Sequence, residues 1–129
     1  MSTISWEELT GQLAERLPRL EVDDVVILVA PGNRYTQLVQ LKDKLALDAV
    51  SNSFLPPEGQ LTADQERQLE SKGWQPPEGA FRQLWWHEVT KWPLHSRDAA
   101  VVAELMVSTL RDVHGVADPS EIEVRAFQS

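Results

Sequence analysis

The sequence predicts an α+β domain in which helices pack on an antiparallel sheet, in the order α-β-β-β-α-β-α-β. Three short apolar runs follow one another between residues 25 and 50 with only turn residues between them, and such short connections favour antiparallel neighbours. Two capping-box signals mark helix starts. A long segment from about residue 97 to 114 is apolar over most of a helical circumference. At 129 residues, the chain is expected to form a single domain, 1–129.

The first helix is expected to begin after Ser5, because Ser5 and Glu8 have the spacing of a capping box. The apolar residues behind this cap recur at helical spacing: Trp6, Leu9, Leu13 and Leu17. Pro18 disfavours helical geometry in the residue before it, so the helix should end near Leu17. Its stability must come from packing this one apolar stripe.

Three strands are predicted next, over residues 25–29, 35–41 and 45–50. The first is apolar on both faces, which is typical of a central or covered strand. Residues 31–33, Pro-Gly-Asn, supply the turn to the second. In the third strand Leu45, Leu47 and Ala49 share one face, and Asp48 is the one charge on the other. A lone acid on the open face of a sheet is more often solvated than functional.

A second, short helix is expected to begin after Thr62, which forms a capping box with Gln65, and to stop at Gly73. With Gly73 as the left-handed residue after the helix, Trp74 can contact Leu69 on the last turn, as in a Schellman motif. Trp74 is therefore predicted to be a structural plug.

Residues 73–94 hold four of the five tryptophans, and aromatic side chains dominate both cores and interfaces. Residues 81–87 have strand-like composition, with aromatic side chains on both faces. Two interpretations stay open: these tryptophans serve the domain's own core, or a partly exposed set forms an apolar groove or subunit interface. On the second interpretation, the predicted partner-binding residues are Phe81, Leu84, Trp85, Trp86 and Trp92.

The third helix is expected to have Ser96 as its cap and Gly115 at its end. A helix so apolar must be buried on more than one side. The sheet can cover one side, and the aromatic arm or a second subunit would cover the other. Residues 122–127 then alternate as a last strand, with Ile122, Val124 and Ala126 predicted to face inward.

Composition limits the function. The net charge of −8 comes from 20 acidic and 12 basic residues, so phosphate backbones are repelled and nucleic-acid binding is disfavoured. The chain has no cysteine, which excludes disulfides and thiolate metal sites. No segment approaches the ~20 apolar residues of a membrane span. We expect a soluble cytoplasmic protein without a membrane partner.

The candidate catalytic, metal and cofactor motifs each lack residues that the motif requires. His87-Glu88 resembles the start of a zinc-protease motif, but Lys91 holds the place of the second histidine. The loop 31–36 lacks the paired glycines and lysine of a phosphate loop. We therefore predict a non-enzymatic protein with no cofactor and no metal.

Three features together resemble a known family. They are the helix centred on Trp6, the segment LESKGWQPP at 69–77 and the segment LMVSTLRDVHGV at 105–116. They resemble the TY-Chap domains of actinobacteria, which are similar to type III secretion chaperones and YbjN proteins, over about residues 6–127. The resemblance implies the element order given above, and a chaperone-like or adaptor role in which an extended segment of another protein is held, often by a homodimer. It carries over no catalytic residue.

The main functional hypothesis is a protein-binding module that uses residues 81–92 and the apolar flank of the third helix. An alternative is a small-ligand pocket between the sheet and the aromatic arm, with Asp48, His87 or Glu88 as its polar groups. Another is an immunity-type inhibitor that blocks a basic toxin by charge, which predicts binding that fades steeply with salt.

Overall fold

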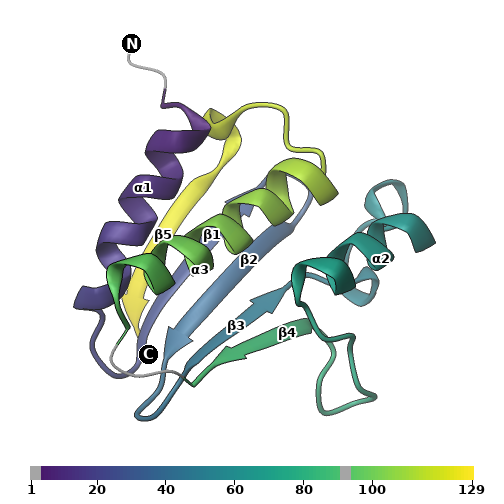
Figure 1. Cartoon of the computed structure of the whole chain (residues 1–129). Helices are drawn as coiled ribbons and strands as arrows, with labels where there is room; N and C mark the ends of the chain where they lie inside the picture. The colour runs from purple at the N-terminus through teal and green to yellow at the C-terminus, as the bar shows by residue number, and fades with distance from the viewer. Residues whose placement is uncertain (1–3, 91–93) are drawn as a thin grey trace.

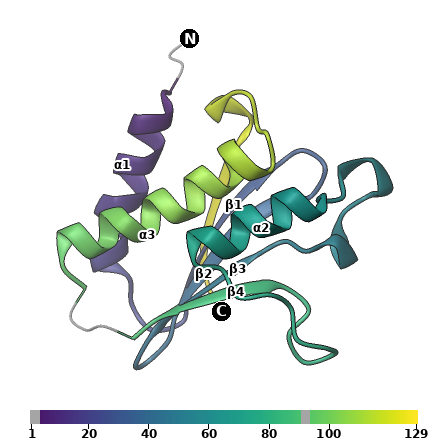
Figure 2. The ribbon, with the colours of Figure 1, turned by 45° about the vertical axis from the view of Figure 1, so that its right-hand side comes forward.

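The computed structural model describes residues 4–90 and 94–129, and it forms one five-stranded sheet with three helices on one face (Figures 1 and 2). The sheet order is β4-β3-β2-β1-β5, and every neighbouring pair is antiparallel. The strands are β1 (Asp24–Ala30), β2 (Arg34–Gln40), β3 (Leu45–Ala49), β4 (Trp85–Val89) and β5 (Glu123–Gln128). The predicted α+β class and the order α-β-β-β-α-β-α-β are confirmed.

The helices begin largely where the capping signals place them. In α1 (Trp6–Arg16), the amide of Glu8 donates to the Ser5 hydroxyl at 3.0 Å, and the Glu8 carboxylate accepts from the Ser5 amide at 3.4 Å. A 3₁₀ turn, Leu17–Arg19, then ends the helix as Pro18 predicts. The same reciprocal pair joins Thr62 and Gln65 at the start of α2 (Ala63–Lys72).

Gly73 and Trp74 end α2 as predicted. Gly73 has a φ of 108°, and the Trp74 amide donates to the Leu69 carbonyl at 3.1 Å. The Trp74 side chain is buried, and its indole N–H donates to Thr109 Oγ1 at 2.9 Å. Since Thr109 lies at the end of the third helix, Trp74 joins α2 to that helix through the core.

The third helix, α3 (Ser96–Ser108), continues into a π-helical turn, Thr109–Val113. Its N-cap is His95, with extended backbone, so the prediction of Ser96 as the cap was wrong by one residue. The second side of α3 is covered by other helices of the chain and not by the predicted aromatic arm, whereas cover by a second subunit stays a prediction. α1 crosses α3 on the helix face of the sheet (Figure 1), and α2 packs against the Thr109–Val113 turn. The apolar flank of α3 is thus mostly buried within the chain.

The two faces of the sheet differ in their cover. The side chains facing the helices form the core, as expected for Leu45, Leu47 and Ala49. On the other face the alternate residues of β1 are only half-buried: Val25, Ile27 and Val29. The strand is central, as predicted, but no helix covers its second face (Figure 2). No described helix is long and apolar enough to cross a membrane.

The last strand departs most from the prediction. β5 pairs with β1 at one edge of the sheet, and all six of its residues are exposed. Val124 and Ala126 do face the helix side, because they lie opposite Leu28 and Val26, which are buried in the core. Neither side chain is buried, because α1 packs beside α3 and leaves a depression between itself and β5. The expected inward burial of these residues was therefore wrong.

Candidate functional site

The outer edge of β5 presents backbone groups that have no strand partner in the described chain. Ser129 donates its amide to the Asp23 carbonyl at 2.9 Å, which fixes the alternation of the antiparallel ladder with β1. The residues that bond to β1 are therefore 123, 125, 127 and 129. The amides and carbonyls of Val124, Ala126 and Gln128 point away from the sheet, so this edge has the geometry that accepts an added strand.

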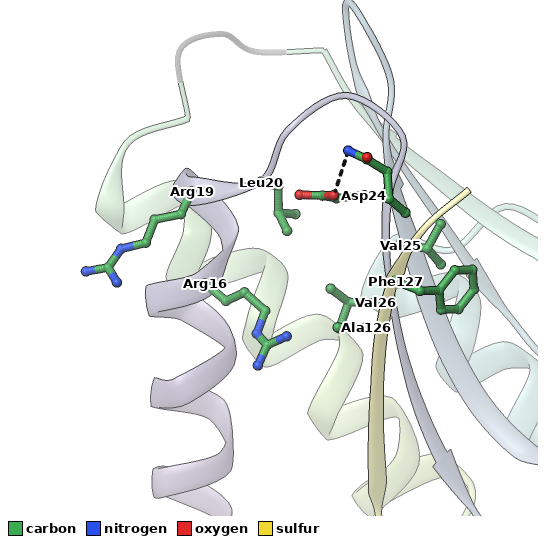
Figure 3. Close-up of a pocket in the computed structure, with 9 residues that line it drawn as sticks. Arg16, Arg19, Leu20, Asp24, Val25, Val26, Ala126 and Phe127 are labelled. Atoms are coloured by element: carbon green, nitrogen blue, oxygen red, sulfur yellow. Dashed lines mark hydrogen bonds between the residues drawn. The ribbon is translucent and has the colours of Figure 1, made fainter.

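A groove lies between this edge and α1. The larger of its two depressions, of about 330 Å³, is shown in Figure 3. It is lined by Arg16, Arg19, Leu20, Asp24, Val25, Val26, Ala126, Phe127 and Gln128. The smaller, of about 90 Å³, is lined by Leu9, Gln12, Leu13, Arg16, Leu28 and Val124. Both depressions are lined by Arg16 and by residues of β1 and β5, so they lie next to each other, and we refer to the two together as the groove.

Exposed apolar side chains gather at the same edge. Val124 is 42% exposed and Phe127 51%. Val22, at 50%, precedes β1, and its carbonyl accepts from the side chain of Gln128 at 3.3 Å. These are three of the six large hydrophobic side chains exposed in the described part of the chain. Such a concentration beside an unpaired strand is typical of interaction surfaces.

Comparison with known families identifies the family of this chain. A family model described as "T3SS (YopN, CesT) and YbjN peptide-binding chaperone 3", TY-Chap3, matches residues 2–128. The chain belongs to the TY-Chap3 family. The predicted relationship to type III secretion chaperones and YbjN proteins is thereby confirmed, and the family is one of non-enzymatic chaperones that bind peptide segments of partner proteins. No curated protein and no solved structure matches the chain significantly.

Four of the five predicted partner-binding residues are described, and they lie in different environments of the TY-Chap3 domain. Phe81 is fully exposed near the tip of a hairpin, residues 75–86, that leads into β4, and Leu84 is half-buried. Trp85 is 2% exposed and belongs to the core. Trp86 is half-buried on the open face, with the Arg82 guanidinium 4.0 Å from its ring centre. Trp92 lies outside the described residues. Of the four that are described, Phe81 alone is fully exposed and Trp85 alone is buried.

The hairpin explains why β4 starts four residues later than predicted. Glu78 and Arg82 pair through two backbone hydrogen bonds of 2.7 and 3.3 Å, and Gln75 pairs with Trp86 at 2.7 and 3.1 Å. Gly79, with a φ of 60°, allows the turn between them. Residues 81–84 therefore serve the turn and its return, although their aromatic composition resembles a strand of the main sheet.

The polar groups of the small-ligand hypothesis do not converge in the TY-Chap3 domain. Asp48 and Glu88 lie on the open face, whereas His87 faces the helices, with Nδ1 3.1 Å from the Gly73 carbonyl oxygen. Burial raises the pKa of Asp48, and the nearby Glu88 also raises it. Lys44 donates to Glu88 at 2.6 Å and lowers the pKa of that carboxyl. These groups are held by neighbours on two faces, so they form no common pocket.

Sequence reasoning missed the β5 edge and Arg16. The alternation of residues 122–127 predicts the strand and the direction of its side chains, but carries no information about whether a helix reaches over it. The charges Glu123 and Arg125 are the one usable signal, because charged side chains are common on edge strands. Arg16 had no signal beyond its place in the last turn of α1, where a cation suits the helix dipole.

Proposed function

We propose that this chain is a chaperone-like adaptor that holds an extended segment of another protein as an added strand along β5. The observation that carries the proposal is the fully exposed six-residue edge strand beside the groove. In strand addition the backbone hydrogen bonds supply affinity, and pockets for alternate side chains supply specificity. Val124, Ala126 and Gln128 would provide the backbone groups, and the groove beneath α1 would take every second side chain.

Hydrogen exchange in the presence of a bound segment tests this arrangement. The amides of residues 125 and 127 bond to β1 and should be protected with or without a ligand. The amides of Val124 and Ala126 should exchange fast in the free protein and slowly in the complex. If a peptide binds and these two amides stay unprotected, strand addition at β5 is refuted.

A proline variant gives a second test of the same proposal. Ala126→Pro removes an outward-pointing amide and places the ring at the free edge, where proline is tolerated in strands. Loss of one hydrogen bond and the added ring should weaken peptide binding by about ten-fold or more. The unfolding midpoint should change little. Ala126→Ser is the matched control, because it keeps the amide and should bind as the wild type does.

We keep the aromatic hairpin as a second proposed contact region. The supporting observations are that Phe81 is fully exposed and that Leu84 and Trp86 are only half-buried. Trp85 would act only indirectly, by anchoring β4 in the core. Trp92 keeps the role proposed from the sequence, without a structural argument for it.

A homodimer is also proposed, with the β5 edges of two copies as the competing use of the groove. Antiparallel pairing of β5 with its symmetry mate would join the two sheets and bury the same outward amides. Light scattering across a range of protein concentrations distinguishes the two uses, because only the dimer has a mass that depends on concentration. The cytoplasmic location stays a prediction.

A further inference from the structure

Arg16 is directed at the edge strand. It lies on the last turn of α1 and lines both depressions of the groove. In Figure 3 its side chain extends from α1 into the space in front of Ala126, whereas Arg19, one turn later, extends away from β5. A single guanidinium therefore faces the position that an added strand would occupy.

The charge of Arg16 is not used within the described chain. Arg16 forms no ion pair with any residue in 4–90 or 94–129, although the protein carries a net charge of −8. Asp24, the one acid lining the groove, accepts from the Glu21 amide at 2.7 Å and from Gln128 Nε2 at 3.3 Å. The helix dipole favours a cation at this end of α1, and the exposed guanidinium keeps its five N–H donors available to a ligand.

An added strand brings alternate side chains under this guanidinium. Such a strand would lie about 4.8 Å from β5. Its residues opposite Val124 and Ala126 would point to the helix side, in register with those two side chains. Arg16 lines the depressions that contain both, so a side chain at either position comes within its reach.

We propose that the groove selects a segment that alternates apolar residues with a carboxylate at the helix-side position facing Arg16. The inference rests on the proposed strand addition at β5 and names the class of segment that it takes. This preference for an acidic segment is opposite to the preference that the net charge of the whole molecule would give. A field from the net charge of −8 favours a basic peptide, so a preference for an acidic one must come from the local cation.

Three synthetic peptides test the inference. Each has the length of β5 and alternates valine with serine, and they differ only in having Asp, Asn or Lys at one central helix-side position. Fluorescence anisotropy at low salt should give tightest binding for Asp, then Asn, then Lys. Each step should be about five-fold, the size of a rim charge pair. Added salt should narrow the differences.

Two variants of equal charge change complete the test. Arg16→Glu should reverse the order, so that the Lys peptide binds best. Arg67→Glu is the control, because it makes the same change of charge on an exposed side chain of α2 that lines neither depression of the groove. It should keep the order of the three peptides with less than about two-fold change. An equal effect of both variants would show a diffuse field and overturn the inference.

The remaining outcomes separate this inference from the proposed function. If the three peptides bind the wild type equally well and Ala126→Pro weakens all of them, strand addition stands and selection by Arg16 is refuted. If none of the peptides binds, or if a second copy fills the groove at the working concentration, both proposals fail.

Discussion

His114 should make the free energy of unfolding fall as the pH drops from 7 to 4.5. The residue follows the Thr109–Val113 turn and is 9% exposed. Its Nε2 atom is buried and has no hydrogen-bond partner in the described chain. Arg34 lies beside it and donates from Nη1 to the His114 carbonyl at 3.1 Å. Burial, and secondarily the charge of Arg34, lower the pKa of His114 from 6.5 to about 4.

The sign follows from proton uptake. In the folded protein His114 stays neutral down to about pH 4, whereas in the unfolded chain it takes up a proton near pH 6.5. Below pH 6.5 the unfolded state therefore binds more protons, and acid favours unfolding. This stability is fully present above pH 6.5 and is lost as the pH falls toward 4. Each pKa unit corresponds to about 1.4 kcal/mol, so the whole effect is about 3 kcal/mol, of which about 2 kcal/mol falls between pH 7 and 4.5.

Urea unfolding followed by tryptophan fluorescence at pH 7 and pH 4.5 measures this loss. His114→Phe keeps a ring and removes the titrating group. Between the two pH values, the free energy of unfolding of this variant should fall by about 2 kcal/mol less than that of the wild type. The carboxylates titrate in both proteins, and their effect cancels in the comparison. His95→Gln is the control, because His95 is exposed and should leave the loss unchanged. Parallel losses in the wild type and His114→Phe would refute the assignment.

Three further predictions concern stability and the hairpin. Gly73→Ala should lower the free energy of unfolding by about 1 kcal/mol or more and the melting midpoint by about 4 °C, because a side chain is strained at a φ of 108°. Gly11→Ala should raise the free energy of unfolding by up to about 1 kcal/mol, because Gly11 lies inside α1 and an added methyl group meets nothing within 4 Å. A change of the same sign in both variants would refute the reasoning. Thr109→Val should cost about 1–3 kcal/mol in denaturant unfolding, because it leaves the buried indole N–H of Trp74 unpaired; a change below about 0.5 kcal/mol would show that this bond contributes little. Phe81→Ser should leave the unfolding midpoint unchanged, because Phe81 is fully exposed, and should weaken capture of a partner if the hairpin contacts it; unaltered capture removes Phe81 from the proposed contact region.

Local patterns were enough for most of the fold. The bounds of β1, β2, β3 and β5 lie within one residue of the predicted ranges, because hydrophobic periodicity and turn residues determine them locally. The left-handed conformation of Gly73 and the burial of Trp74 after it were also predicted from local sequence.

The candidate site depends on tertiary contacts that the sequence does not show. Periodicity identifies the apolar flank of α3, but not that α1 packs against this flank and covers it. It likewise gives the helix-side direction of Val124 and Ala126, but not that α1 stops short of covering them. The aromatic composition at Phe81 indicates a strand, yet the nearby turn at Gly79 decides the local structure. Which side chains a helix covers depends on how the whole domain packs.

The two ends of the sheet are not equivalent, and this limits what the molecule can build. At the β4 end, Trp86 exchanges both of its backbone hydrogen bonds with Gln75 of the same chain, whereas the β5 end stays open. Stacking copies end to end would require β5 of each molecule to dock on β4 of the next, and the hairpin already occupies that place. The two edges therefore favour the addition of one strand at β5 over the end-to-end stacking of copies.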